Sequence, residues 1–154
     1  MRKIKILIPV YNDWQSVFKL LENINLEVSK LESEFSVIIV NDASTEARPE
    51  FLTNLSNLKS IQFINMKENK GHARCNAVGL KYINEKEDFD YIIPMDGDGE
   101  DRPEELSLLI KKIKEYPNTV VTANRVRRSE GFLFKFCYLF HKNLTLIFTG
   151  QAIK

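Results

Sequence analysis

Apolar residues along this chain follow two different periods, and polar segments separate them. Short runs rich in β-branched residues have the length and composition of strands that are buried on both faces. These predicted strands cover residues 4–10, 35–40, 60–66, 90–95 and 119–123. Elsewhere apolar residues recur every three or four positions, which is typical of a helix with one buried face. These predicted helices cover about residues 14–24, 49–58, 73–83 and 103–114.

The predicted strands alternate with the predicted helices, and this order indicates βαβ units. We therefore expect an α/β fold, with a mostly parallel sheet and helices on both of its faces. Ligands of such sheets bind beyond the carboxyl ends of the strands. Four polar loops follow predicted strands, so we expect all of them to face one crevice. These loops are residues 11–13, 41–45, 67–71 and 96–101.

The C-terminal part of the chain has a different pattern. Twelve of the seventeen residues from 132 to 148 are apolar, but charged residues interrupt the run. It is therefore too short and too charged for a good membrane span. Two interpretations stay open, a helix that packs on another part of the protein and a helix that lies in a membrane interface. We predict a main domain over residues 1–130 and an apolar helical tail over residues 131–154.

Composition narrows the class of protein. With 154 residues, of which 44% are hydrophobic and 28% charged, the chain has the size and composition of one soluble globular domain. Its net charge of +1 gives no reason to expect nucleic acid as a partner. Two cysteines cannot form a disulfide scaffold, and the N-terminus lacks the apolar stretch and cleavage site of a signal peptide. We therefore expect reduced thiols and a cytoplasmic location.

The densest cluster of chemically active side chains is an acidic turn after the fourth predicted strand. Between Asp96 and Glu105 there are six acids and one base. Asp96 and Asp98 flank a single glycine, so both carboxylates can point at one site. Like charges this close repel each other unless a cation lies between them. Oxygen ligands favour Mg²⁺ or Mn²⁺, and such ions commonly bridge carboxylates to substrate phosphates.

Other classes of site do not fit the sequence. A calcium-binding EF-hand loop starting at Asp96 would need glycine at Asp101 and glutamate at Ser107. The sequence contains neither of the glycine-rich phosphate-binding motifs GxGxxG and GxxxxGK[ST] in the required place. The two histidines, His72 and His141, lie far apart, which argues against a zinc site and against a Ser-His-Asp triad.

Four segments, in order and each at the end of a predicted strand, resemble the motifs of family 2 glycosyltransferases. They read PVYN at 9–12, VNDAST at 40–45, NKGHARCN at 69–76 and MDGD at 95–98. The resemblance extends from about residue 4 to residue 150 and implies the GT-A fold and nucleotide-diphospho-sugar donors. Residues 98–104 and 124–128 resemble more specifically the dolichol-phosphate mannose synthase branch, whose members move a sugar onto a polyprenyl phosphate.

The resemblance also implies roles for individual residues. The nucleotide-sugar site would comprise Pro9, Tyr11, Asn12, Asp42, Ser44, Gly71, Arg74, Asp96, Gly97, Asp98 and Arg125. By the same resemblance, Asp42 would accept a hydrogen bond from the base. Asp96 and Asp98 would be the catalytic residues and would hold the metal, Mg²⁺ or Mn²⁺.

Arg125 and Arg128 would contact phosphates, including that of the acceptor, because guanidinium groups bind phosphate with two parallel hydrogen bonds. The competing interpretation is an exposed basic loop at these two positions. Arg74 could equally form an ion pair on a helix surface, and Tyr11 could pack at a strand end. For His72 we favour a capping or packing role.

This sequence departs from the family pattern in three ways. Asn41 stands where the family often has aspartate, and Ala43 stands where it often has glycine. Family members also usually run well beyond this length, so the resemblance implies a C-terminally truncated member. The donor side of the site is thus well represented in the sequence, and the acceptor side is not.

We therefore predict a metal-assisted glycosyltransferase of polysaccharide or cell-wall biosynthesis that uses a UDP- or GDP-sugar. A phosphate acceptor is already anionic, so its attack requires no protein base. A polyprenyl-phosphate acceptor would place the protein peripherally at the cytoplasmic face of a membrane. Two alternatives stay open, a family 2 enzyme that acts on a saccharide and a donor-binding module without turnover.

Overall fold

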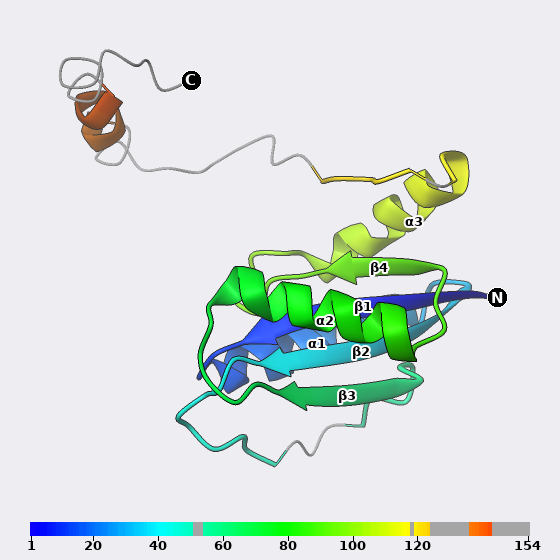
Figure 1. The fold of residues 1–154 in the computed structure, drawn as a ribbon. Coiled ribbons are helices and arrows are strands. Elements are labelled where there is room, and N and C mark those ends of the chain that lie inside the picture. Colours follow the sequence, from blue (N-terminus) through cyan, green and yellow to red (C-terminus); the bar gives the residue numbers. More distant parts are fainter. Residues whose placement is uncertain (51–53, 118, 124–135, 143–154) are drawn as a thin grey trace. The chain divides into compact units, whose positions relative to one another are not determined.

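Figure 1 shows the computed structural model of the chain, which describes residues 1–50, 54–117, 119–123 and 136–142. The chain divides into two compact units, Met1–Val121 and Thr122–Lys154. The strands of the first unit are β1 (Arg2–Val10), β2 (Ser33–Asn41), β3 (Ser60–Asn65) and β4 (Tyr91–Pro94). Its helices are α1 (Trp14–Val28), α2 (His72–Lys86), the short 3₁₀ helix η1 (Pro103–Glu105) and α3 (Leu106–Glu115).

The four strands form one sheet in the order β3-β2-β1-β4, and every described pair is parallel. In the register of the sheet, Ile6 of β1 lies opposite Val37 of β2 on one side and Ile93 of β4 on the other. Figure 1 shows α2 in front of the sheet and α1 behind it. The predicted α/β fold, with a parallel sheet and helices on both faces, is therefore confirmed.

The side chains of the central strands alternate between two apolar cores. Ile4, Ile6 and Ile8 point into a large cluster that includes buried residues of α1 and α3. Leu7 points the other way, into a smaller cluster with residues of α2. On that face the helix lies very close to the sheet: a Cβ atom placed on Gly79 of α2 would lie only 2.3 Å from Leu7 Cδ1. Glycine at this position therefore permits the close approach. Burial on both faces explains why these strands are mostly apolar in the sequence.

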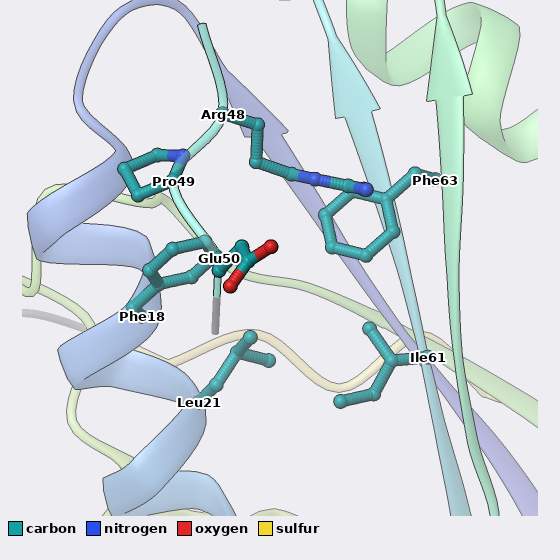
Figure 2. A pocket seen from close by; sticks show the side chains of 7 residues that line it. All are labelled: Phe18, Leu21, Arg48, Pro49, Glu50, Ile61 and Phe63. Atoms are coloured by element: carbon teal, nitrogen blue, oxygen red, sulfur yellow. The ribbon is translucent and has the colours of Figure 1, made fainter. Parts of the chain in front are cut away.

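One predicted helix, residues 49–58, is wrong. The described residues of this segment, 49–50 and 54–58, are not helical. Figure 2 shows the Arg48 side chain stretched across Phe63 of β3, with the guanidinium carbon 3.9 Å from the ring centre. Further along, the Asn57 backbone N–H donates to Asn25 Oδ1 (2.9 Å), and the Asn57 side chain donates to the Asn25 carbonyl. These contacts with α1 and β3 outweigh a local preference for helix.

The fifth predicted strand, residues 119–123, is also wrong. These residues are described, and none of them is in a strand. A strand is stabilised by ladder hydrogen bonds and by burial of its apolar side chains, but Val120 is 92% exposed. Instead, the Thr119 hydroxyl donates to the carbonyl of Tyr116, the residue that caps α3. This contact continues the turn that ends the helix.

In the second unit, residues 136–142 are helical. Phe136, Leu139 and Phe140 of this helix are exposed. The rest of the tail and the predicted domain boundary at residue 130 lie outside the described residues. No helix in the described part of the chain is long and apolar enough to span a bilayer. The choice between a packing helix and an interfacial helix therefore stays a prediction.

Candidate active site

The polar loops that follow the strands meet at one edge of the sheet, as the sequence predicts. The loop after β1 is joined to the loop after β2 by a hydrogen bond from the Asn12 backbone N–H to Ser44 Oγ (2.8 Å). The loop after β2 is joined to the start of α2 through Asp42. The turn after β4 reaches the same helix start, where His72 Nε2 lies 3.4 Å from Asp96 Oδ1.

Asn12 connects the loop after β1 to the loop after β2 by hydrogen bonds. Its backbone has a φ of 61°, a left-handed conformation that asparagine tolerates better than most residues. Its Oδ1 accepts from the backbone N–H of Thr45 (2.8 Å) and of Glu46 (3.1 Å), and its Nδ2 donates to Thr45 Oγ1 (3.0 Å). In the structure Asn12 thus shapes the site through the neighbouring loop. Its predicted contact with a nucleotide sugar stays a prediction.

Asp42 connects the end of β2 to the start of α2. It is only 4% exposed, and its two carboxylate oxygens accept from the backbone N–H groups of Lys70 and Gly71, both at 2.8 Å. Gly71 has a φ of +83° and directly precedes the helix. The carboxylate therefore fixes the entry into α2. Its contact with a nucleotide base, implied by the resemblance, stays a prediction.

The acidic turn packs directly on the end of β1. The Met95 N–H donates to the Leu7 carbonyl (2.9 Å), so the chain continues beside β1 after β4 has ended. At Gly97 a Cβ atom would lie 3.0 Å from the Pro9 carbonyl oxygen and 2.9 Å from Val17 Cγ2. Glycine is required here because the turn approaches the backbone of β1 too closely for a side chain.

Hydrogen bonds within the turn set its shape. The Asp96 N–H donates to Asp101 Oδ2 (2.8 Å), and the Glu100 N–H donates to Asp98 Oδ1 (2.9 Å). The side chain of Asp96 is 54% exposed, so its carboxylate is accessible to a ligand. Two of the turn's own carboxylates, those of Asp98 and Asp101, therefore accept from its backbone, while Asp96 presents acidic oxygens at the sheet edge.

A cavity of about 200 Å³ opens at this edge. Its lining residues come from the end of β1, the start of α1, the start of α2 and the acidic turn. They are Pro9, Val10, Tyr11, Asp13, Val17, His72, Asp96, Gly97 and Asp98. Both aspartates thus line one cavity, together with three further residues of the predicted nucleotide-sugar site, Pro9, Tyr11 and Gly97.

Asp98 also lines a second hollow of about 380 Å³, whose other residues come from α1 and from the loop that leads to η1. A third, more apolar pocket of about 420 Å³ lies between α1 and β3 under Arg48 (Figure 2). None of the residues that line this third pocket belongs to the predicted nucleotide-sugar site. The cavity between Asp96 and Tyr11 is therefore the one that fits the sequence analysis.

The structure adds His72 to the residues that line the cavity. From the sequence we favour a capping or packing role for this histidine, but its ring nitrogen Nε2 faces Asp96 at 3.4 Å. The same nitrogen lies 2.8 Å from Asn76 Nδ2, one turn further along α2. The available signal was its position directly after Gly71, the last residue of a loop predicted to face the crevice.

Not every predicted site residue reaches the cavity. Arg74 is exposed near the start of α2 and lines neither cavity that contains Asp98. Asn12, Asp42 and Ser44 surround the site through the hydrogen bonds given above. Arg125 and Arg128 lie outside the described residues, so their predicted phosphate contacts stay predictions.

Cys75 is close to the site but is not a candidate nucleophile. Its side chain is fully buried, and its thiol donates to the Val40 carbonyl (3.1 Å). Burial, with a smaller contribution from the charge of Asp42, raises the pKa of the Cys75 thiol to about 11. The thiol therefore stays protonated at neutral pH, and only a thiolate is a good nucleophile.

The donor set fits a divalent ion that is shared with a substrate. Among the described residues, no three histidine, cysteine, aspartate or glutamate side chains converge closely enough to enclose a metal by themselves. Mg²⁺ and related ions are commonly held by one or two carboxylates, with substrate phosphates and water as the other ligands. Asp96 and Asp98, which line one open cavity, supply that kind of incomplete oxygen site.

Comparisons with known proteins show the family and the fold of the chain. The profile of "Glycosyl transferase family 2" matches residues 5–150. A curated relative, the undecaprenyl-phosphate 4-deoxy-4-formamido-L-arabinose transferase of Proteus mirabilis (strain HI4320), is 28% identical over 132 residues. That match covers 86% of this chain, which spans only 40% of the relative's length.

Two solved structures share the fold. The mannosyltransferase PcManGT from Pyrobaculum calidifontis, in complex with GDP-Man and Mn²⁺, superposes with a TM-score of 0.59 at 20% identity, over 82% of this chain and 36% of that one. S. aureus TarS 1-349 in complex with UDP superposes with a TM-score of 0.54 at 20% identity, over 86% and 39%. Since the family profile covers nearly all of the sequence, the chain belongs to glycosyl transferase family 2.

Proposed function

We propose that this chain is the donor-binding part of a glycosyltransferase that moves a sugar from a nucleotide-diphospho-sugar to a polyprenyl phosphate. One observation carries the proposal: Asp96 and Asp98 line the same cavity as Pro9 and Tyr11, beyond the carboxyl end of β1. Ligands of parallel α/β sheets bind at this edge. The names of the relatives support the substrate classes, a polyprenyl phosphate in one and GDP-Man or UDP in the others.

Within this proposal, the nucleoside lies over the end of β1 and the diphosphate lies toward the acidic turn. Tyr11 lines the cavity and is 47% exposed, so its aromatic side chain is accessible to a planar base. Asp42 accepts from the Gly71 N–H, and the next residue, His72, lines the cavity. Pro9 and Gly97 bring the two ends of the site into direct backbone contact.

Asp96 and Asp98 would hold Mg²⁺ or Mn²⁺ together with the donor diphosphate. When bound, such an ion stabilises the negative charge that develops on the departing nucleoside diphosphate. The two carboxylates would thereby orient the diphosphate relative to the sugar. The exposed carboxylate of Asp96 favours this role, because it is accessible to an ion.

The acceptor assignment rests on chemistry and on the Proteus mirabilis relative. A phosphate oxygen is already anionic, so it can attack the anomeric carbon without a protein base. The new bond joins the acceptor oxygen to the sugar, and the nucleoside diphosphate leaves with the electrons of the broken bond. A polyprenyl chain would require the protein to work at a membrane surface, and this location is part of the proposal.

Calorimetric titration tests the donor assignment. We expect UDP or GDP to bind the wild-type chain more tightly with Mn²⁺ or Mg²⁺ than without, and we expect Asp98→Asn to abolish the metal-dependent part. Glu104→Gln is the matched control, because Glu104 is an exposed acid of the same segment that does not line the cavity. Circular dichroism verifies that both variants fold. Metal-dependent affinity that survives in Asp98→Asn would contradict the metal assignment.

A second assay separates an enzyme from a donor-binding module. The chain is incubated with a nucleotide-sugar and undecaprenyl phosphate, and formation of the glycosylated lipid is followed. Turnover that is lost in Asp98→Asn supports the transferase. Metal-dependent nucleotide binding without turnover indicates that these 154 residues bind the donor only.

A further inference from the structure

The position of His72 at the edge of the cavity is fixed by the fold. His72 is the first residue of α2 and directly follows Gly71. The Gly71 N–H is held by Asp42 Oδ2 at 2.8 Å, and Asp42 is buried at the end of β2. The backbone of His72, and with it the starting point of its side chain, is therefore positioned by a residue at the end of a sheet strand. This distinguishes it from a histidine that lies by chance on a helix surface.

The geometry around the ring places a nitrogen beside a carboxylate. His72 Nε2 lies 3.4 Å from Asp96 Oδ1, and both residues line the cavity that also contains Asp98. In an octahedral site with bonds of about 2.1 Å, neighbouring ligand atoms lie about 3.0 Å apart. The observed separation is close to that value. A small inward movement of either side chain would bring both atoms onto one ion.

A side-chain amide also contacts the imidazole. Asn76 Nδ2 lies 2.8 Å from His72 Nε2, and which group donates in this contact depends on the tautomer of the ring. In the tautomer that leaves Nε2 without a proton, this nitrogen carries the lone pair with which histidine binds metals. A cation would then replace the amide at Nε2 and lie beside the carboxylate of Asp96.

We propose that His72 binds the divalent ion through Nε2 beside Asp96, and that this nitrogen ligand makes the site prefer Mn²⁺ to Mg²⁺. The inference rests on the proposed function, because it concerns the ion at the donor site. Mg²⁺ favours oxygen ligands and water, whereas imidazole suits transition-metal ions. An all-carboxylate site would discriminate little between the two ions. A site with one imidazole favours Mn²⁺.

Electron paramagnetic resonance tests the ligand directly. The full chain is loaded with Mn²⁺ and either UDP or GDP at one fixed pH, and electron spin-echo modulation from a directly bound ¹⁴N nucleus is recorded. We expect this modulation in the wild-type chain and its loss in His72→Ala. His141→Ala is the matched control and keeps the signal, since the chain contains only these two histidines.

Calorimetry of the same samples measures the preference between the ions. In the presence of the nucleotide, His72→Ala is expected to bind Mn²⁺ roughly tenfold more weakly, the order of effect seen when a metal site loses a supporting group. Its affinity for Mg²⁺ is expected to stay almost unchanged. His72→Asp supplies an oxygen in place of nitrogen, so it should restore ion binding without the ¹⁴N signal and with the preference for Mn²⁺ reduced.

The outcomes separate this inference from the function on which it rests. Nucleotide-dependent Mn²⁺ binding without ¹⁴N modulation, or an unchanged ratio of Mn²⁺ to Mg²⁺ affinity in His72→Ala, overturns the role of His72 and leaves the donor site standing. Absence of any Mn²⁺-dependent nucleotide binding in the wild-type chain overturns the proposed function as well.

Discussion

The link between Asp42 and the start of α2 gives the sharpest prediction about stability. In Asp42→Asn, one carboxylate oxygen is replaced by an NH₂ group, which cannot accept from a backbone N–H. One of the two bonds now made to Lys70 and Gly71 is therefore lost, and a backbone donor is left without a partner. Asparagine has nearly the same size, so the change removes the hydrogen bond without creating a cavity.

The magnitude follows from the nature of the bond. A hydrogen bond to a charged group contributes about 1.5–3 kcal/mol, and a donor left unsatisfied in a buried place costs a similar amount. Asp42 is 4% exposed, so water cannot readily replace the lost partner. We expect Asp42→Asn to lower the free energy of unfolding by about 2–3 kcal/mol. That is a large part of the roughly 5–15 kcal/mol typical of a domain.

Urea unfolding measures the global effect, and amide hydrogen exchange at Lys70 and Gly71 measures the local one. Asp90→Asn is the matched control. Asp90 also accepts from a backbone N–H, that of Lys3 at 2.7 Å, but at an exposed position where water can replace it. The control should lose less than about 1 kcal/mol. If Asp42→Asn unfolds like the control and exchange at the two amides is unchanged, Asp42 does not hold the entry into α2.

Three further predictions concern other parts of the site and its support. Ala43 has a φ of 56°, so Ala43→Gly should relieve left-handed strain and raise the free energy of unfolding by about 1 kcal/mol, as measured by urea unfolding. Gly97→Ala should raise the Kd for nucleotide and lower the Tm, because its methyl group would lie 3.0 Å from the Pro9 carbonyl oxygen; an unchanged Tm would show that the turn can move away. The hydrogen bond from Lys5, and a second from Gln62, lower the pKa of Glu87 below its ordinary value of 4.5. A carboxyl with a lowered pKa stabilises the folded state above that ordinary value and loses the effect as the pH falls through the lowered one. The stability difference between wild type and Glu87→Gln should therefore be largest at neutral pH and shrink in acid, and a constant difference would contradict this reasoning.

The sequence predicts those parts of the fold that depend on local pattern. Ile4 to Val10 and Phe35 to Val40 are mostly apolar because both faces of these strands are covered, and parallel pairing follows from the helix between them. The meeting of the loops is then a consequence of topology. Asp96 and Asp98 could be placed together at the sheet edge for the same reason.

Features that depend on specific long-range contacts could not be predicted in this way. The sequence pattern predicts a helix over residues 49–58, but the course of this segment depends on Arg48 over Phe63 and on Asn57 against Asn25. No local periodicity encodes such pairs. The short distance between His72 and Asp96 could not be predicted for the same reason. These residues come close only when α2 and the turn after β4 have both packed against the sheet.

The order of the strands also bears on when the site can exist during folding. Ile6 pairs with Val37, which is close along the chain, and with Ile93, which is far from it. Contacts between distant residues cost more loop-closure entropy, so β1 and β2 can associate well before β4 arrives. The acidic turn rests on β1 and therefore assembles with that last strand. A chain interrupted during synthesis before residue 94 would contain most of its core and yet lack the site where a metal and a diphosphate could bind.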